Sequence, residues 1–572
     1  MLTSGALLRR TLMVGALGGV LMLYLTAVGL VLAFAERNTI AGLVTFGRLM
    51  LVIPPLAAGY AIAGREGPSM SRLASGLAAG AIGGIMLAAA LLFVSAVPGV
   101  RGVLIRISPP LVAFLGFDQG ATIGAALNVG LAAGAGLVGA AARITPPRLR
   151  RALIWGSLGV VIVSTLEPLL RPRLTDFELR AVARFLFEDK GVTIPGAIAV
   201  FAVFGAFTTA WTPVRNRVAD RMAAVDERRR ATIRGLGLLL VILFLLALPQ
   251  IAGSFFSQVL VFVGLYTLLA LGLNIVVGYA GLLDLGYVAF YAVGSYLTAL
   301  LTSPLSSFGL GIPFWIALPV VVLGAAATGL FIGAPVLRLR GDYLAIVTLG
   351  FGEIARILFQ SDALQPVFGG VQGILGIPPI FGVAKVDIPV LGWELSGPTL
   401  TYYPLLFFCI IAAFVAHRLK YSRIGRAWTA MREDEDVAEV TGVNIVNYKL
   451  LAFALGAAVG CLAGAVFVTH LRSVFPGTFD VLVSITVLAI IILGGMGSIV
   501  GVIVGSLVLI GLPELLREFA EFRLLIYGAV LVVMMIARPE GLVPDRARQR
   551  ELHEADDADE ADATGTSLAA ET

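Results

Sequence analysis

The chain has 572 residues, of which 58% are hydrophobic and only 13% are charged. A soluble domain typically carries about 25% charged residues, so this composition excludes an ordinary soluble protein. The formal net charge of +5 gives no case for nucleic-acid binding, because the Lys and Arg residues cluster at the ends of apolar runs. Three scattered histidines, and two cysteines inside apolar runs, predict no metal site.

Apolar runs long enough for a helix to cross a hydrocarbon core about 30 Å thick recur from end to end. The sequence therefore predicts an all-α polytopic integral membrane protein with about 16 transmembrane helices, some of them short or broken. The spans predicted in the first part are 11–35, 41–63, 74–97, 120–142, 152–170 and 192–211. Those in the second part are 235–253, 257–277, 281–301, 313–336, 343–360, 400–417, 448–471, 482–495, 498–512 and 523–538.

Basic loops predict the orientation of these spans, because cytoplasmic loops carry an excess of Lys and Arg. A cytoplasmic N-terminus places the basic segments 143–151, 215–234 and 418–426 on the cytoplasmic side. The C-terminus is also cytoplasmic if residues 482–512 form two short helices hinged at GGMGS (494–498). Glycine-interrupted short helices are typical of transport pathways, so Gly494, Gly495 and Gly497 are pathway candidates.

One strongly polar stretch, GRAWTAMREDEDVAEVTGVN (425–444), lies between apolar spans. Ser422 can start a short helix there, and Gly442 can end it in a left-handed turn. On one helix, Arg432 would be a surface neighbour of both Glu435 and Asp436. The less polar side chains would form a narrow stripe, made of Ala427, Ala430, Met431, Ala438 and Thr441. Such a helix suits docking into a groove on a soluble partner, and a solvated connector is an equal alternative.

The segment SRIGRAWTAMREDEDVAEVTGVNIVNYKLLAFALGAAVGCLAG (422–464) resembles a loop and the following span of LivM-type permeases. These are membrane subunits of ABC importers for branched-chain amino acids and related substrates. The resemblance covers about residues 235–545, with further matching segments in the family's order. These segments are NIVVGYAGLLDLGYVAFYAVGSY (274–296), LRLRGDYLAIVTLGFGEIARILF (337–359), LAIIILGGMGSIVGVIVGSLVL (488–509), LPELLREF (512–519) and RPEGLVP (538–544).

The resemblance implies that the loop 422–447 couples the permease to a separate ATPase. The residues it assigns to coupling are Gly425, Arg426, Arg432, Glu433, Asp434, Glu435, Glu439 and Gly442. The chain contains no GxxxxGK[ST] phosphate loop, so we expect ATP to be used by the partner and no cofactor to be bound by this chain. Further implied partners are a second, LivH-type permease subunit and an extracytoplasmic substrate-binding protein, in a bacterial inner or plasma membrane.

Four regions are predicted: a transmembrane extension (1–211), a basic cytoplasmic linker (212–234), the LivM-type permease domain (235–545) and an acidic disordered tail (546–572). The extension has no counterpart of the charged loop, of NIVVGYAG or of GGMGS. We therefore do not expect it to be a second, fused permease.

Charged and polar residues inside the spans are further pathway candidates, because such residues are costly in lipid. Glu353 and Arg356 share a helix face, either in the pathway or as a self-compensating structural pair. Asp284 lies among glycines, either at a substrate-contacting helix break or as the cap of the next span. Asn274 and Gly281 of the segment NIVVGYAG complete this set of candidates.

The predicted function is that of an importer permease working by alternating access. The alternative is an ion-coupled secondary transporter, which would need buried acidic residues such as Glu353 or Glu167. A membrane-embedded enzyme would need clustered His, Asp or Ser groups in the spans, and the sequence shows none. Substrate identity stays open, because leucine, other amino acids, urea and short amides all fit.

Overall fold

The computed structural model describes residues 4–64, 68–97, 106–176, 178–224, 227–336, 342–388, 393–515, 525, 528, 531, 532 and 541–544. Most of the predicted span 523–538 and the whole predicted tail 546–572 lie outside these residues. The chain divides into two compact units, Met1–Leu236 and Gly237–Thr572. The finer domain boundaries expected from the sequence stay predictions.

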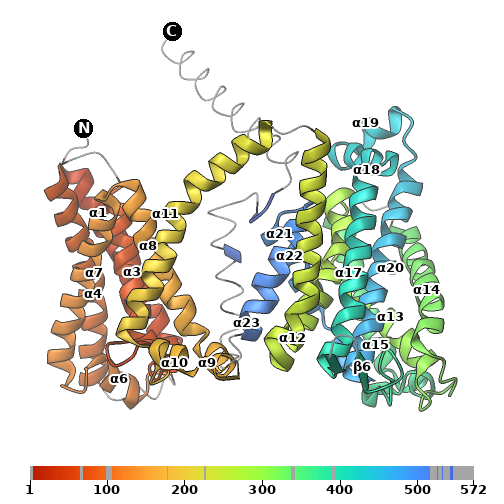
Figure 1. The fold of residues 1–572 in the computed structure, drawn as a ribbon, viewed down its shortest axis with the longest axis horizontal. Helices are drawn as coiled ribbons and strands as arrows, with labels where there is room; N and C mark the ends of the chain where they lie inside the picture. The colour runs from red at the N-terminus through yellow and green to blue at the C-terminus, as the bar shows by residue number, and fades with distance from the viewer. Residues whose placement is uncertain are drawn as a thin grey trace, which may run out of the picture. The chain divides into compact units, whose positions relative to one another are not determined.

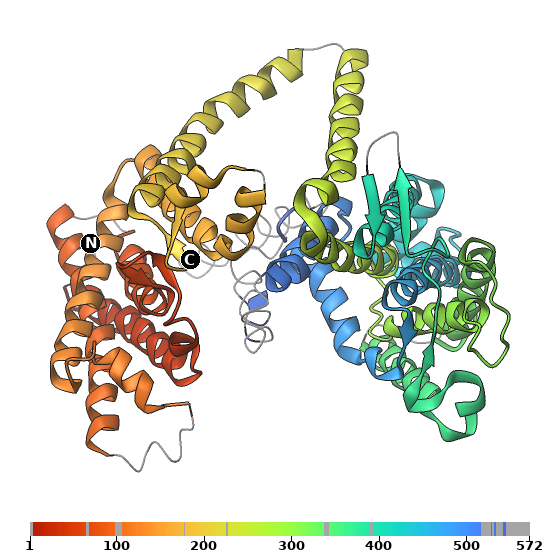
Figure 2. The ribbon, with the colours of Figure 1, turned by 60° about the horizontal axis from the view of Figure 1, so that its bottom comes forward.

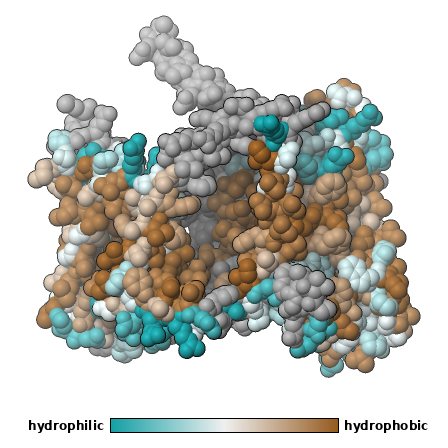
Figure 3. All heavy atoms as spheres, viewed as in Figure 1, coloured by the Kyte–Doolittle hydropathy of each residue, from teal (hydrophilic) through white to brown (hydrophobic). Residues whose placement is uncertain are grey.

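Within the described residues, nine helices are long and apolar enough to cross a membrane, and five shorter helices are apolar. Each of them overlaps a span predicted from the sequence. The predicted span 152–170 corresponds to the helix α8 (Pro147–Thr165), which α9 (Glu167–Asp176) follows. In each unit, hydrophobic side chains form a band between more hydrophilic ends (Figure 3). The prediction of an all-α polytopic membrane protein is confirmed.

The first unit is a set of helices with a small sheet (Figure 1). Besides α8 and α9, its helices are α1 (Ser4–Ala27), α2 (Leu30–Ala33), α3 (Phe46–Ile62), α4 (Ser69–Ala96), α6 (Pro109–Leu115), α7 (Ala121–Ile144), α10 (Arg180–Leu186) and α11 (Ile194–Ala224).

Glycines bring the backbones of α3, α4 and α7 into direct contact. A Cβ atom on Gly80 would lie 2.2 Å from the carbonyl oxygen of Ala132, and one on Gly59 would lie 2.0 Å from that of Gly136. Small residues are how helices associate closely in lipid, where no hydrophobic driving force pairs them. We call this contact of three helices the glycine seam.

The sheet of the first unit has the strand order β2-β1-β4-β3. Its strands are β1 (Asn38–Ile40), β2 (Val44–Thr45), β3 (Phe187–Glu188) and β4 (Gly191–Val192). The predicted span 41–63 is therefore wrong at its start, because α3 begins only at Phe46. The reason is local: Gly42 turns the chain with φ 69°, and the Thr45 hydroxyl caps α3 by accepting from the Arg48 amide at 3.3 Å.

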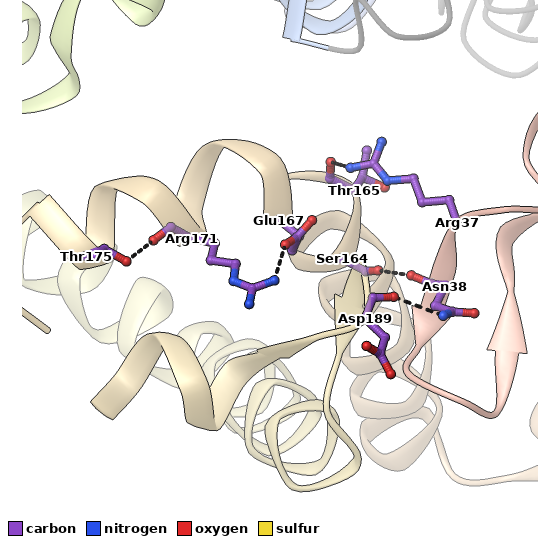
Figure 4. Close-up of polar contacts among 8 residues, drawn as sticks. All are labelled: Arg37, Asn38, Ser164, Thr165, Glu167, Arg171, Thr175 and Asp189. Atoms are coloured by element: carbon purple, nitrogen blue, oxygen red, sulfur yellow. Dashed lines mark hydrogen bonds and ion pairs between the residues drawn. The ribbon is translucent and has the colours of Figure 1, made fainter. Parts of the chain in front are cut away.

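Polar contacts fasten this sheet to α8 (Figure 4). Arg37, only 8% exposed, donates from Nη2 to the carbonyl oxygen of Thr165 at 2.8 Å, at the end of α8. The Ser164 hydroxyl donates to the carbonyl oxygen of Asn38 at 3.0 Å. A cation near a helix C-terminus is favourable, because the last carbonyl groups lack partners within the helix. These contacts give the buried Arg37 a structural role.

The second unit begins on the long helix α12 (Glu227–Leu273), which is interrupted at Gly253 with φ 82°. Its further helical segments are η1 (Asn274–Tyr279, a π-helix), α13 (Val288–Thr302), α14 (Phe314–Val336), α15 (Asp342–Gln360), η2 (Asp362–Leu364), α16 (Gln365–Phe368), η3 (Gly370–Gln372), α17 (Pro398–Lys420), α18 (Arg423–Glu433), α19 (Glu435–Val440), α20 (Ile445–Leu471), η4 (Pro476–Thr478), α21 (Val481–Gly494), α22 (Ile499–Ser506), η5 (Leu507–Gly511, a π-helix) and α23 (Leu512–Leu515). Short strands pair β5 (Ile374–Leu375) with β8 (Ser473–Val474), and β6 (Lys385–Ile388) with β7 (Trp393–Ser396) (Figure 2).

Helix α20 packs closely on α13 in the core of this unit. A Cβ atom on Gly294 would lie 2.2 Å from the carbonyl oxygen of Cys461, so the two backbones touch. The predicted span 281–301 starts too early, since α13 begins at Val288 after an irregular segment. The prediction that 482–512 is two short helices is confirmed by α21 and α22, with Gly495 and Gly497 at φ 114° and 79° between them.

Candidate functional site

The polar loop between α17 and α20 contains the two short helices α18 and α19, at one end of the second unit (Figure 1). Ser422 starts α18, because its hydroxyl accepts from the amides of Ile424 at 3.1 Å and Gly425 at 3.3 Å. Gly442 follows α19 with φ 91°, in the left-handed conformation. Both predicted ends of the loop helix are confirmed.

The loop breaks at Asp434, which corrects the expectation of one continuous helix. The backbone of Asp434 is extended there, with φ −155° and ψ 114°. Its Oδ1 accepts from the amides of Asp436 at 2.9 Å and Val437 at 3.0 Å, and so starts α19. Arg432 therefore stands on a different helix from Glu435 and Asp436, and the expected single helix surface does not form.

The inner face of the loop is anchored to α20 through Trp428. This side chain is fully buried, and its Nε1 donates to the carbonyl oxygen of Tyr448 at 2.9 Å. Trp428 was not among the residues predicted from the sequence. Of the predicted stripe, Ala427, Met431 and Ala438 are buried, while Ala430 and Thr441 are exposed.

An ion pair between a buried lysine and a partly exposed glutamate is a second anchor between the loop and α20. Lys449 Nζ lies 2.7 Å from Glu435 Oε1, and the Lys449 residue is only 4% exposed. The Glu435 carboxylate therefore binds Lys449 of the same chain. Lys449 was not among the predicted residues either, although a lone lysine in a predicted span indicates an acidic partner.

The outer face of the loop is acidic and carries two exposed valines, Val437 at 59% and Val440 at 89%. Five of the residues assigned to coupling are exposed: Arg426, Glu433, Asp434, Glu439 and Gly442. The other three, Gly425, Arg432 and Glu435, contact the rest of the chain.

Two interrupted helices meet beneath this loop. The first interruption comprises η1 and the irregular residues 280–287, and the second is the turn 495–498 between α21 and α22. They touch directly, because the Gly497 amide donates to Asn274 Oδ1 at 2.9 Å. Asn274 is fully buried.

Two basic side chains connect the loop region to these interruptions. Arg432 Nη1 donates to the carbonyl oxygen of Gly278 at 3.2 Å, and Lys420 Nζ donates to that of Gly497 at 2.9 Å. Gly281, with φ 72°, leaves room for the arginine, since a Cβ atom there would lie 2.5 Å from Arg432 Cγ. The structure thus brings together four predicted residues (Asn274, Gly281, Arg432 and Gly497) and adds Lys420. We call this group the junction.

The remaining pathway candidates lie elsewhere in the second unit. Asp284 is 1% exposed, and its Oδ1 accepts from the Gly286 amide at 2.9 Å in the irregular segment before α13, whose N-cap residue makes no capping bond with its side chain. Glu353 pairs with Arg356 on α15, with 3.0 Å from Arg356 Nε to each carboxylate oxygen. Gly494 packs against Gly501 of α22. A part in a translocation pathway stays a prediction for all of them.

A cavity of about 570 Å³ opens among α12, α13, α20, α21 and the segment η5–α23. Its apolar wall includes Phe262, Leu265, Tyr291 and Phe467, and its polar groups include Glu514. No predicted pathway residue lines it. Within the described part of the chain, no group of three or more His, Cys, Asp or Glu side chains is arranged to hold a metal ion.

Comparison with known proteins concerns the second unit. The family model described as branched-chain amino acid transport system / permease component matches residues 255–537. The high-affinity branched-chain amino acid transport system permease protein LivM of Escherichia coli (strain K12) is 43% identical over 295 residues, which cover 49% of this chain and 68% of the relative.

More distant relatives support the same assignment. The probable branched-chain amino acid transport permease protein LivM of Methanocaldococcus jannaschii is 25% identical, over 51% of this chain and 93% of the relative. The permease protein LivH of Salmonella typhimurium is 25% identical, over 49% of this chain and 91% of the relative. No solved structure is significantly similar to the chain. With its LivM-like second unit, the chain belongs to the family of branched-chain amino acid transport system permease components.

Proposed function

We propose that this protein is the permease subunit of an ATP-driven ABC importer for branched-chain amino acids, with other amino acids, urea and short amides as further candidates. In this proposal it works with separate ATPase subunits, a LivH-type permease and an extracytoplasmic binding protein. It lies in a bacterial inner membrane with both termini in the cytoplasm. ATP is hydrolysed only by the ATPase, consistent with the missing phosphate-loop motif.

The observation that carries this proposal is the two-sided loop α18–α19. Its inner face is held by the Trp428 hydrogen bond and by the Glu435–Lys449 ion pair, so the loop is firmly attached to α20. Its outer face leaves Val440 89% exposed beside acidic side chains. A rigid helical element with exposed apolar and charged groups suits a groove on a partner protein better than it suits a solvated connector.

The outer face also indicates the chemistry of the partner. Glu433, Asp436 and Glu439 are exposed there, so the groove on the ATPase should be lined by basic side chains. Val437 and Val440 would enter an apolar floor. The loop then moves with the ATPase when that subunit binds and hydrolyses ATP.

The lining of the cavity in the second unit favours a small substrate with an apolar side chain. Its aromatic and aliphatic wall suits the side chain of a branched-chain amino acid, and the Glu514 carboxylate suits an ammonium group. The relatives named for branched-chain amino acid transport support the same substrate class.

Two acidic residues named for the alternative, an ion-coupled transporter, have basic partners. Glu167, 6% exposed, lies in the first turn of α9 with its Oε1 3.5 Å from Arg171 Nη1 (Figure 4). Glu353 pairs with Arg356. Because each carboxylate is already balanced by an arginine, these contacts favour the ATP-driven reading.

Reversing the charge of Glu433 or Glu439 tests the docking surface. Each of Glu433→Arg and Glu439→Arg is expected to weaken ATPase binding roughly 100-fold, because like charges facing each other across an interface cost several kcal/mol. The measurement is the amount of ATPase that co-purifies with the tagged permease from mild detergent. The matched control is Asp362→Arg, an exposed acidic residue in η2, near the other end of the second unit.

Retention of the ATPase by both reversed variants would contradict the docking surface. The energy source is tested separately by uptake into membrane vesicles containing the complete transporter. ATP inside the vesicles is expected to drive leucine uptake after ion gradients are collapsed with ionophores. Uptake that follows the ion gradient and ignores ATP would establish the secondary transporter instead.

A further inference from the structure

We infer that the junction transmits the movement of the loop to the two interrupted helices, with Arg432 and Lys420 as the positioning residues that make this connection. The inference rests on the proposed function, because it assumes that the ATPase moves the loop. The role of Arg432 then differs from that of the exposed acidic residues of the same loop. Arg432 would act inside the permease, while Glu433 and Glu439 contact the partner.

Arg432 contacts the first interrupted helix at the end of η1. The carbonyl oxygen that it reaches, that of Gly278, belongs to the last turn of η1, where carbonyl groups lose their partners within the helix. A guanidinium there is favourable both as a donor and as a positive charge at a helix C-terminus. Displacing α18 would therefore pull on η1 or leave its end uncapped.

Lys420 contacts the second interruption, in the turn between α21 and α22. It is the last residue of α17, just ahead of the loop, and its Nζ lies 2.9 Å from the carbonyl oxygen of Gly497. The same ammonium lies 5.8 Å from the ring centre of Tyr279 in η1. One lysine thus contacts both interruptions at the point where the chain enters the loop.

Glycines at positions 278 and 281 allow these contacts to be short. A Cβ atom on Gly278 would lie 2.1 Å from Asn274 Oδ1 and 2.8 Å from the Gly497 amide nitrogen. A Cβ atom on Gly281 would collide with Arg432. Any larger residue at these two positions would separate the interruptions from each other or from the arginine. The two interruptions therefore behave as one body, which Arg432 and Lys420 link to the loop.

This arrangement predicts what the junction does during transport. Helices interrupted inside the membrane can change alignment without unfolding, because their ends already lack regular backbone hydrogen bonds. Movement of the loop would shift Arg432 and Lys420 together, and the two helix ends would follow. Without these side chains the loop can still dock and move, but the permease no longer responds to it.

The test uses the complete transporter in proteoliposomes and measures leucine taken up for each ATP hydrolysed. Arg432→Met removes the guanidinium and keeps a long side chain, so leucine per ATP is expected to fall about tenfold, the loss typical of a charged hydrogen bond. Bound ATPase and ATP hydrolysis are expected to stay near the wild-type level. Arg432→Lys is expected to restore part of the ratio. The matched control is Arg423→Met, an exposed arginine on the same helix, which should leave the ratio unchanged.

The results separate this inference from the proposed function. A wild-type complex without ATP-dependent leucine uptake overturns the proposed function, and this inference with it. ATP-driven uptake with an unchanged ratio in Arg432→Met overturns only the inference. If Arg432→Met does not assemble, Lys420→Met tests the second contact with the same expected loss. Failure of both methionine variants to assemble, with Arg423→Met assembling normally, shows that the contacts only hold the fold and also overturns the inference.

Discussion

Replacing Glu435 by glutamine is expected to lower the free energy of unfolding by about 3 kcal/mol, which would make it one of the most damaging conservative changes in the loop. The variant keeps the size of the side chain but leaves the Lys449 ammonium buried without its charged partner, 2.7 Å away in the wild type. A buried, unpaired charge costs far more than the pair contributes, because the desolvation of the lysine is no longer offset. The measurement is unfolding of the purified protein by SDS in mixed micelles.

Two further variants identify the buried charge as the cause. The double variant Glu435→Leu with Lys449→Met removes both charges and is expected to recover most of the lost stability, since apolar residues can replace a buried ion pair. Glu433→Gln, at an exposed position two residues away, is expected to change stability by no more than about 0.5 kcal/mol. Equal loss of stability in Glu435→Gln and in the double variant would show that the charges are not the cause.

Replacing Gly494 by alanine is expected to destabilise the pair α21–α22 by about 3 kcal/mol, the upper end of the usual cost of overpacking. The added Cβ atom would lie 2.1 Å from the carbonyl oxygen of Gly501 and 3.0 Å from the amide nitrogen of Val502. Both are backbone atoms of α22, so no side chain can rotate away. The unfolding assay used for Glu435 measures the loss.

The control for Gly494 is a helical glycine with free space around it. At Gly350 in α15 an added Cβ atom would meet nothing within 4 Å, and alanine there is expected to stabilise the helix by about 0.5–1 kcal/mol. Opposite signs at the two positions would establish close backbone approach as the reason for glycine. Similar small effects at both would mean that α22 can move away from α21 at little cost.

The sequence predicted most of the helices because apolar length is a direct physical requirement for crossing a membrane. The strands at 38–45 were missed for a related reason. The run LVTFGRL (43–49) reads equally well as the start of a helix, since a short apolar segment does not by itself distinguish a strand from a helix. β1 is a strand because it pairs with β2 and, at Ile40, with Val192 of β4, which is distant in the sequence.

The loop shows a similar limit at the level of single residues. Ser422 and Gly442 could be predicted, because caps depend on residue type and local backbone. The direction of Arg432 could not, since its acceptor, Gly278, lies 154 residues away in the sequence. Charged residues in one polar stretch look alike until the fold shows which of them point into the protein and which reach the surface.

The glycine seam of the first unit has a consequence for how this unit can evolve. In an ordinary core, a larger side chain on one helix can be accommodated by a smaller one on its neighbour. At Gly59 and Gly136 no such exchange exists, because the opposing surface is already bare backbone, 2.0 Å from a new Cβ atom on Gly59 and 2.3 Å from one on Gly136. Exposed positions such as Phe93 carry no such restriction. Descendant sequences should therefore drift freely on the outer surface of these helices while the seam remains unchanged.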